Sequence, residues 1–425
     1  MKKFLHLSLV LILCFSLLPV SAAEPVTIKF WTHINEAWNA SYEELVAEFE
    51  QANPDIKVDY QRFPYGEFEA KIQTSLMAGN AAADVYEVWG GWVLDFASQG
   101  VLSETPAKFA AELEDDAYAP VLGALKHEGK YYGAPVEFNI EYGGMVVNKK
   151  LYDEAGMTYP TTWAQLIEDA KKVAVKDGEV MKMRGFGFST PDTLTSNFLA
   201  LILQSGGQYL KEDGSVDFTI PEATAAMKQL VAYTADDHIN NLDTLTNQDT
   251  QDDHMMVALD ESFGCVRGPW VLSDLEQSYG LTMGVDFEYI SQPPFFEGVE
   301  QKFAAETGWS LCVPKNTAAE EAAWRFVEFL NQPDVLLRHN IACAQVPPRR
   351  SVANDPDYIA GAPYMLPLLD KLQYAQFIGP FNTDILKDYL KQTYMNLVIG
   401  DHSDEAIQDA CVKLTEDLAQ AMKIY

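Results

Sequence analysis

The sequence predicts an α/β fold divided into two lobes, and three observations support this prediction. Segments with the two-residue period of a strand alternate with segments of helical period in the N-terminal part of the chain. The length of 425 residues exceeds what one hydrophobic core usually serves. Hydrophobic residues make up 48% of the sequence, which suffices for ordinary globular cores.

The segment 1–23 predicts a secretory signal peptide. It combines a positively charged start, an almost wholly apolar run over residues 4–18 and a break followed by small residues, with cleavage expected near Ala22 or Ala23. The apolar run is shorter than the roughly 20 residues of a membrane-spanning helix. Because Cys14 does not follow a small residue, we expect no lipid anchor. The mature protein should therefore be periplasmic or extracellular.

The elements that follow alternate between strand and helix. Residues 26–30 and 56–60 alternate apolar and polar side chains like strands, and residues 41–54 between them carry an apolar helical face that stops at an Asn-Pro pair. A second helix over 67–80 precedes a short strand over 83–89. This order is typical of a parallel sheet with right-handed crossovers. Ligands collect at the carboxyl ends of the strands in such sheets.

The same periods predict the later elements. These are a strand leading into a loop (143–152), a helix with Thr161 or Thr162 as its N-cap (160–174), a strand (309–314), a helix (318–330) and a long terminal helix from Asp404. Trp163 and Trp324 lie on the apolar stripes of two of these helices. We therefore expect both rings to be part of hydrophobic cores.

The charge of the chain limits its partners. The sequence contains 62 acidic and 30 basic residues, a formal charge of −32, and loss of a signal peptide with two lysines makes the protein more acidic still. Such a charge repels phosphate backbones and anionic lipid surfaces. We expect no nucleic-acid partner and no direct membrane insertion.

Four cysteines lie beyond the expected signal peptide: Cys265, Cys312, Cys343 and Cys411. Four cysteines permit three pairings, but a chain of this length does not need disulfides for stability. Disulfides and buried free thiols are both open on the sequence alone. No Cys or His pair has metal-ligand spacing, and the Gly-rich segment 184–190 is an incomplete phosphate loop, so we expect no metal and no cofactor.

Five motifs occur in a fixed order along the chain. They are AAADVYEVWGGWVLDFASQGVL (81–102), GKYYGAPVEFNIEYGGMVVNKKLYDEAGMTYPTTWAQL (129–166), GPW (268–270), ETGWSLCVPKNTAAEEAAWRFVEFL (306–330) and VPPRRSV (346–352). In this order they resemble segments of the extracellular solute-binding proteins of ABC importers, in the carbohydrate group that includes the maltodextrin-binding proteins. The resemblance covers nearly the whole mature chain.

The resemblance implies a two-lobe α/β fold of the periplasmic-binding-protein type (type II), with the ligand cleft between the lobes. The chain should cross between lobes near residues 134–136, near residues 292–294 and after Leu330. The expected division is 24–135 and 296–330 for lobe 1, the N-terminal lobe, and 136–295 and 331–425 for lobe 2, the C-terminal lobe.

Nine residues are candidate ligand contacts. Sugars present apolar C–H faces and a rim of hydroxyls, so a binder needs flat aromatic surfaces and side chains with paired donors or acceptors. The tryptophans at expected strand ends are Trp31, Trp89, Trp270 and Trp309. The residues chosen for hydroxyl recognition are Glu36, Glu137, Asn139 and Arg349, with Tyr142 as a further ring or phenol.

Each candidate also has a structural alternative. Any one of the four tryptophans could pack in a core, and both glutamates could be solvated surface charges. Arg349 could form a structural ion pair, since the neighbouring Arg350 could equally point inward. The resembled family often carries an acidic residue where this chain has Trp89, which favours stacking over a known sugar preference.

The resemblance implies a secreted substrate-binding protein that captures a carbohydrate, from a monosaccharide to a small oligosaccharide, and delivers it to the permease of an ABC importer. It implies a monomer that performs no chemistry. Two alternatives remain open. One is a non-sugar ligand, either a polyamine favoured by the acidic balance or a polyol phosphate held by Arg349. The other is a secreted glycoside hydrolase, although the sequence carries no hydrolase motif.

Overall fold

The computed structural model describes residues 24–425 except Asn80, Glu179 and 247–251. The expected signal peptide therefore lies outside the described residues. In the part of the chain that is described, no helix is long and apolar enough to cross a membrane.

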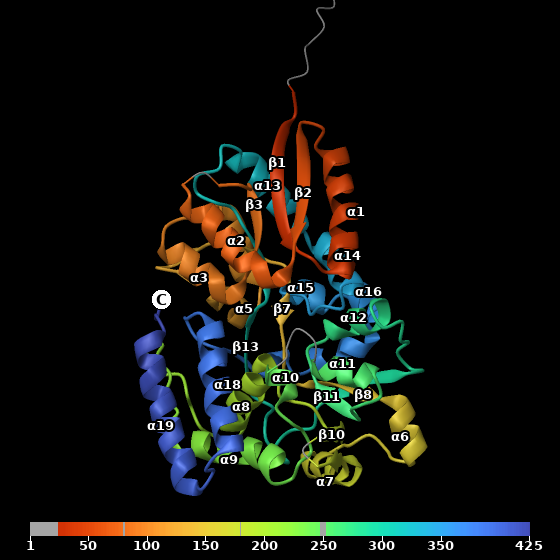
Figure 1. Ribbon diagram of the computed structural model, residues 1–425. Helices are drawn as coiled ribbons and strands as arrows, with labels where there is room; N and C mark the ends of the chain where they lie inside the picture. The colour runs from red at the N-terminus through yellow and green to blue at the C-terminus, as the bar shows by residue number, and fades with distance from the viewer. Residues whose placement is uncertain (1–23, 80, 179, 247–251) are drawn as a thin grey trace, which may run out of the picture.

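Two hydrophobic cores divide the protein into two lobes, one above the other in Figure 1. The core of lobe 1 collects buried side chains from residues 28–136 and 309–343. The core of lobe 2 collects them from residues 138–305 and 344–422, together with Val121. The predicted two-lobe architecture is confirmed.

A mixed five-stranded sheet forms the centre of lobe 1, in the order β2-β1-β3-β14-β6. The first three strands are parallel, as the alternation of strands and helices predicts, but β14 runs antiparallel to β3. The strands are β1 (Val26–His33), β2 (Ile56–Phe63), β3 (Val85–Trp89), β14 (Trp309–Cys312) and β6 (Ala134–Pro135). The helices packed around them include α1 (Glu36–Ala52), α2 (Tyr65–Met77), α3 (Gly90–Ser98), α13 (Glu320–Leu330) and α14 (Pro333–Ala342).

Strand β1 is three residues longer than the sequence pattern indicates. Its pairing with β2 continues through Trp31 opposite Gln61 as far as His33. Asn35 then caps α1 by accepting a hydrogen bond from the Trp38 backbone N–H at 3.2 Å. Trp31 therefore lies inside the strand and not in the loop that follows it.

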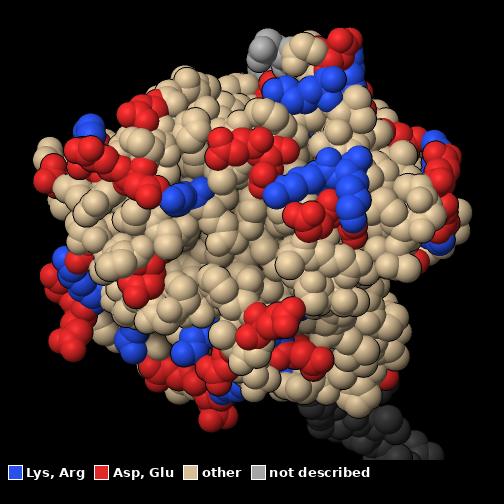
Figure 2. Space-filling view, turned by 90° about the horizontal axis from the view of Figure 1, so that it is seen from below, with Lys and Arg blue, Asp and Glu red and all other residues tan. Residues whose placement is uncertain are grey.

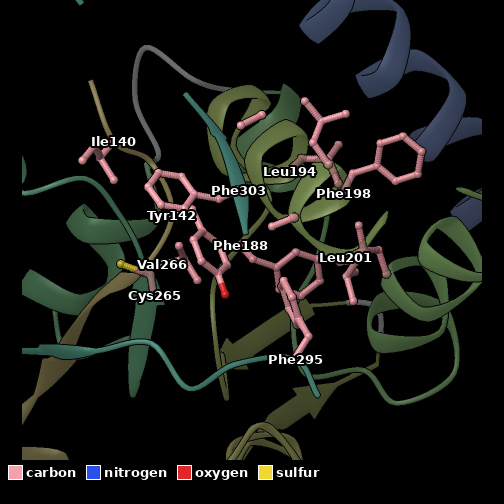
Figure 3. Close-up of a cluster of buried hydrophobic side chains, with 14 of the residues drawn as sticks. Ile140, Tyr142, Phe188, Leu194, Phe198, Leu201, Cys265, Val266, Phe295 and Phe303 are labelled. Carbon is pink, nitrogen blue, oxygen red and sulfur yellow. The ribbon is translucent and has the colours of Figure 1, made fainter. Parts of the chain in front are cut away.

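Lobe 2 combines two three-stranded sheets and a two-stranded one with long helices. Strand β8 (Gly144–Asn148) lies between β11 (Gly264–Val266) and β12 (Phe287–Ser291), antiparallel to both. The helices, in the lower half of Figure 1, include α7 (Trp163–Val173), α8 (Pro191–Gln204), α9 (Pro221–Ala235), α12 (Val271–Gln277), α18 (Thr383–Ile399) and α19 (Asp404–Ala421). Figure 3 shows part of the core that they enclose.

Several local predictions are confirmed. Thr162 is the N-cap of α7 and accepts a hydrogen bond from the Gln165 N–H. Trp163 and Trp324 are 6% and 5% exposed and belong to the two cores. The four cysteines of the described chain are free and buried, which decides the question that the sequence leaves open.

The lobe boundaries differ from the expected ones in two places. Strand β13 (Phe303–Thr307) belongs to lobe 2, because it pairs with β15 (Ala375–Phe377) and with β7 (Phe138–Asn139). Helix α14 belongs to lobe 1, because it packs on α1. Gln292 stays within lobe 2, where its Nε2 donates to the Asn197 side chain. The second crossing therefore comes after β13, and the third comes after α14.

The three crossing segments lie side by side and form the hinge. The Val136 N–H donates to the Trp309 carbonyl at 3.0 Å, and the Phe138 N–H donates to the Val346 carbonyl at 2.8 Å. These hydrogen bonds join the segments 134–139, 307–309 and 343–346. Because the chain passes from one lobe to the other through these three segments, they are the natural axis for relative rotation of the lobes.

Candidate functional site

A cavity of about 630 Å³ lies between the two lobes. From lobe 1 it is lined by the carboxyl ends of β1 and β3, the start of β14 and the first turns of α1 and α2. From lobe 2 it is lined by the starts of α8, α12 and α18. The cavity thus occupies the sheet edge where ligands collect in open α/β folds.

Trp309 is at the centre of an aromatic cluster on the lobe 1 wall. The His33 ring stacks on it with a centroid distance of 4.3 Å and an interplanar angle of 9°. Trp89 and Tyr65 meet it edge to face at 5.4 and 6.0 Å. His33 is held in turn by Glu87, whose Oε2 lies 2.6 Å from Nδ1. The cluster fixes the orientation of a flat wall.

Trp270 forms an aromatic wall on the lobe 2 side. Its indole Nε1 donates to Glu141 Oε1 at 2.8 Å, and the Arg267 guanidinium carbon lies 5.0 Å from its ring centroid. The His254 ring meets it at 5.3 Å. Trp270 is therefore oriented before any ligand binds.

Carboxylates outnumber cations in the cavity wall. The carboxylate residues are Glu69, Glu137, Glu141, Asp192, Asp252, Asp384 and Asp388, whereas the cationic ones are Arg267 and Lys387. Arg267 Nε lies 3.0 Å from Asp252 Oδ1, and Lys387 Nζ lies 2.9 Å from Asp192 Oδ1. Burial raises the pKa of Asp192, but Lys387 and then Arg267 outweigh it and hold the pKa below its usual value.

Glu137 is the most deeply buried carboxylate of this wall, with 4% of its surface exposed. Its Oε1 accepts a hydrogen bond from the Trp309 backbone N–H at 3.0 Å. Burial raises the pKa of Glu137 to about 8, the Trp309 N–H opposes this, and the carboxylates of Glu87 and Glu141 add to it. The carboxyl group is therefore largely protonated at neutral pH in the empty cavity.

The model of the bacterial extracellular solute-binding proteins matches residues 35–336 of the chain. The protein belongs to this family. A putative binding protein of Brucella abortus is 25% identical over 296 residues, 69% of each chain. A probable sugar-binding periplasmic protein of Rhizobium meliloti is 30% identical over 175 residues, 39% of this chain and 40% of that protein. The maltose-bound MalE3 of T. maritima has a TM-score of 0.73 at 22% identity, covering 93% of this chain and 99% of that one.

This solute-binding protein brings five of the nine predicted contacts to the cavity. They are Trp89, Glu137, Asn139, Trp270 and Trp309. Asn139 reaches it from the hinge strand β7, and the two lobe 1 tryptophans reach it from the strand ends that the sequence indicates. Whether these five contact the ligand stays a prediction.

Two predicted contacts are packed inside the lobes. Trp31 is 8% exposed, donates from Nε1 to Gln61 Oε1 at 3.0 Å and packs on Phe63 in the lobe 1 core. Tyr142 is 1% exposed and packs beside Phe303 in the lobe 2 core, as Figure 3 shows. For Trp31 the reason is the longer β1, which keeps this residue inside the strand with its ring turned into the core.

Glu36 lies outside the main cavity. It is the exposed first residue of α1, beside a separate space of about 200 Å³ between α1 and α12. This position corresponds to the solvated charge that the sequence leaves open as its alternative.

Arg349 lies at the hinge, not in the cavity. Its Nε and Nη2 donate to Asn331 Oδ1 at 3.0 and 2.8 Å, and its Nη1 lies 3.8 Å from an Asp116 oxygen. Arg350 turns toward the backbone carbonyls of Asp115 and Ala117. Neither arginine lines the cavity, and the structural alternative for Arg349 describes its position.

Sequence reasoning missed several residues of the wall. His33 and Trp38 lie in the same FWTHINEAW segment as Trp31, and Arg267 directly precedes the GPW motif. Those neighbours of recognised motifs could have been found. Asp192 and Lys387 come from the first turns of α8 and α18, where no sequence signal marks them.

Within the described chain, no group of three or more His, Cys, Asp or Glu side chains is arranged to hold a metal ion.

Proposed function

We propose that this protein captures a carbohydrate, from a monosaccharide to a small oligosaccharide, in the interlobe cavity and delivers it to the permease of an ABC importer. One observation supports this most directly. Trp309 and Trp270 line one space from opposite lobes, and amide and charged side chains line the remainder. Trp309 is 6% exposed with His33 stacked on one face, and Trp270 is held by its hydrogen bond to Glu141. Sugars need this combination of flat apolar surface and hydrogen-bonding rim.

The relatives support the same class of ligand. The Rhizobium meliloti protein is named as a probable sugar-binding periplasmic protein, and the T. maritima protein holds maltose in its structure. The chain is similar in sequence to part of the first and shares the fold of the second.

The proposed cycle is one of binding and closure without chemistry. A sugar binds in the open cleft, the lobes rotate about the three hinge segments, and the closed form excludes water from the ligand. The permease then recognises the closed pair of lobes. The protein acts as a secreted monomer after its signal peptide is removed near Ala22 or Ala23.

A thermal-shift screen of the mature protein against mono-, di- and oligosaccharides tests this function. A ligand at about a hundred times its dissociation constant stabilises the folded state by roughly 2.7 kcal/mol, which raises the melting temperature measurably. We expect a shift with one class of saccharide and recovery of that saccharide intact. No shift with any saccharide would contradict the proposal, and hydrolysis of an added oligosaccharide would favour an enzyme.

A further inference from the structure

The negative charges of the cavity wall exceed the positive charges that the protein places there. Arg267 is shared between Asp252 and Glu141, at 3.0 and 3.5 Å, and Lys387 between Asp192 and Asp384, at 2.9 and 3.4 Å. Each of the two cations of the wall is thus already used by two carboxylates.

Glu137 receives no such cation. Among the described residues no salt bridge reaches it, and the only hydrogen bond on its carboxylate comes from the Trp309 backbone N–H. It is 4% exposed, lines the cavity and has the like charges of Glu87 and Glu141 nearby. A buried carboxylate without a counter-charge is costly, so Glu137 holds a proton in the empty cavity. A ligand that brings a positive charge favours the charged carboxylate, and the proton is released when this ligand binds.

The backbone is shaped to admit this carboxylate. A Cβ at position 308 would lie 1.8 Å from Glu137 Oε1, so only a glycine leaves room for the side chain. The carboxylate is thereby held directly beside Trp309, whose ring lines the same cavity. A cation and an apolar ring face can therefore be recognised at adjacent positions.

The net charge of the whole molecule also favours a cation. The chain carries a formal charge of −32. Figure 2 shows groups of acidic side chains, with basic ones among them, on the face of the molecule seen from below. A field of this sign raises the local concentration of cationic ligands and speeds their association.

The wall contains hydrogen-bond donors that a simple polyamine could not satisfy. The amides of Asn35, Asn139 and Gln345 line the cavity beside the carboxylates. A polyamine carries donors and no acceptors at neutral pH, whereas sugar hydroxyls and ring oxygens accept hydrogen bonds. The two tryptophan walls likewise fit the flat face of a ring better than a flexible chain.

We propose that the ligand is an amine-bearing saccharide whose ammonium group binds the Glu137 carboxylate while its sugar ring lies against Trp309. This inference rests on the proposed function and specifies its substrate class. The ammonium supplies the missing counter-charge, and the hydroxyls supply acceptors for the amides of the wall.

Isothermal titration calorimetry with matched sugars tests this inference. The probes are glucose, galactose, mannose and cellobiose, their amino-sugar counterparts, the N-acetylated counterparts, and spermidine, all at pH 6.5 where the amines are charged. At least one amine-bearing sugar should bind tenfold or more tighter than both its neutral and its N-acetylated counterpart. If the amine-bearing sugars bind no tighter, the inference is overturned; binding by the neutral sugars would then still support the proposed function. Binding of spermidine without any saccharide would overturn both.

Variants separate the charge from the fold. Glu137→Gln keeps the size of the side chain and its acceptor for Trp309, so the preference for the amine-bearing sugar over its N-acetylated form should fall at least tenfold. Glu67→Gln makes the same change at an exposed site of α2 outside the cavity and should leave that preference unchanged. An unchanged preference in folded Glu137→Gln would overturn the assignment of the ammonium to this carboxylate.

Discussion

At the residue scale, the position of each tryptophan relative to the end of its strand decides whether it reaches the cavity. Trp89 is the last residue of β3 and Trp309 the first of β14, which is antiparallel to β3 and paired with it at these two positions. Trp31 lies two residues before the end of β1 and turns into the core. The alternation of side chains along a strand makes a boundary error of a few residues decisive.

A matched pair of tryptophan variants tests this distinction. Trp270→Phe removes indole area and the hydrogen bond to Glu141, so ligand binding should weaken by about 1 to 3 kcal/mol in titration calorimetry. Trp31→Phe loses similar area from the core and should lower stability while leaving affinity unchanged. Equal affinity in Trp270→Phe and the wild type would remove Trp270 from the binding site.

The ionisation of Glu137 predicts how stability depends on pH. Its pKa is about 8 in the folded protein and near 4.5 when solvated, because burial and the carboxylates of Glu87 and Glu141 disfavour its charge. The folded state then binds more protons than the unfolded state in this range, so this group's contribution to the free energy of unfolding decreases as the pH rises from 4.5 to 8. Denaturant titrations should show Glu137→Gln gaining stability relative to the wild type across this window. A constant difference would contradict the raised pKa.

The VPPRRSV motif makes Arg349 a candidate ligand contact, but its position at the hinge gives it a structural role. Its two hydrogen bonds to Asn331 tie the segment after α14 to the end of α13. Arg349→Ala leaves the buried Asn331 oxygen without these donors and should lower the free energy of unfolding by about 1 to 3 kcal/mol. Chemical denaturation measures this loss. Unchanged stability with weakened sugar binding would instead place Arg349 in ligand recognition.

At the element scale, the hinge ladder connects the fold to the binding site. β7 supplies Asn139 and follows directly on Glu137, while the third segment runs beside it to Val346. The same backbone segments therefore allow rotation and carry side chains of the cavity wall.

Gly308 is the most constrained position of this ladder. In Gly308→Ala the new methyl group would displace the Glu137 carboxylate, so both stability and ligand affinity should fall, stability by roughly 1 to 3 kcal/mol. Gly66→Ala is the matched control, because no atom lies within 4 Å of a Cβ built there and the residue is helical. Melting temperature and calorimetry give the two readouts. If Gly308→Ala changed neither stability nor ligand affinity, the Glu137 carboxylate would not occupy the space beside Gly308.

The sequence predicts most elements correctly because their signals are local. Alternation marks β1, β2 and β3, and a threonine cap and an apolar stripe mark α7. The lobe boundaries depend on which sheet a segment joins, and neither β13 nor α14 carries that information in its own residues. Long-range pairing with β15 and β7 and packing on α1 decide it.

At the scale of the whole molecule, the lobes also meet beside the cavity. Trp92 Nε1 on α3 donates to Asp384 Oδ2 on α18 at 2.8 Å, and Asn382 Nδ2 donates to Asp95 Oδ2 at 2.7 Å. These contacts join lobe 1 to lobe 2 away from the hinge. They must break when the cleft opens and re-form when it closes.

This arrangement predicts a change of shape on binding. Small-angle X-ray scattering of the mature protein should give a smaller radius of gyration with the saccharide than without it, because the ligand favours the closed form. Spermidine, if it does not bind, serves as the control. An unchanged radius at saturating saccharide would contradict closure as the signal to the permease.

The site as a whole is only partly predictable from sequence. Its lobe 1 wall follows from strand ends and a family motif, whereas its lobe 2 wall is assembled from first turns of helices far apart in the chain. The excess of carboxylates over cations is a property of the two walls together, so no single segment of the sequence indicates it.

A crystal structure of the mature protein with the tightest-binding saccharide of the screen tests most directly whether the interlobe cavity holds a saccharide. We expect a sugar ring against Trp309, with its polar groups in hydrogen-bond contact with Glu137 and Asn139. A saccharide bound elsewhere on the protein, with this cavity filled by water, would contradict it.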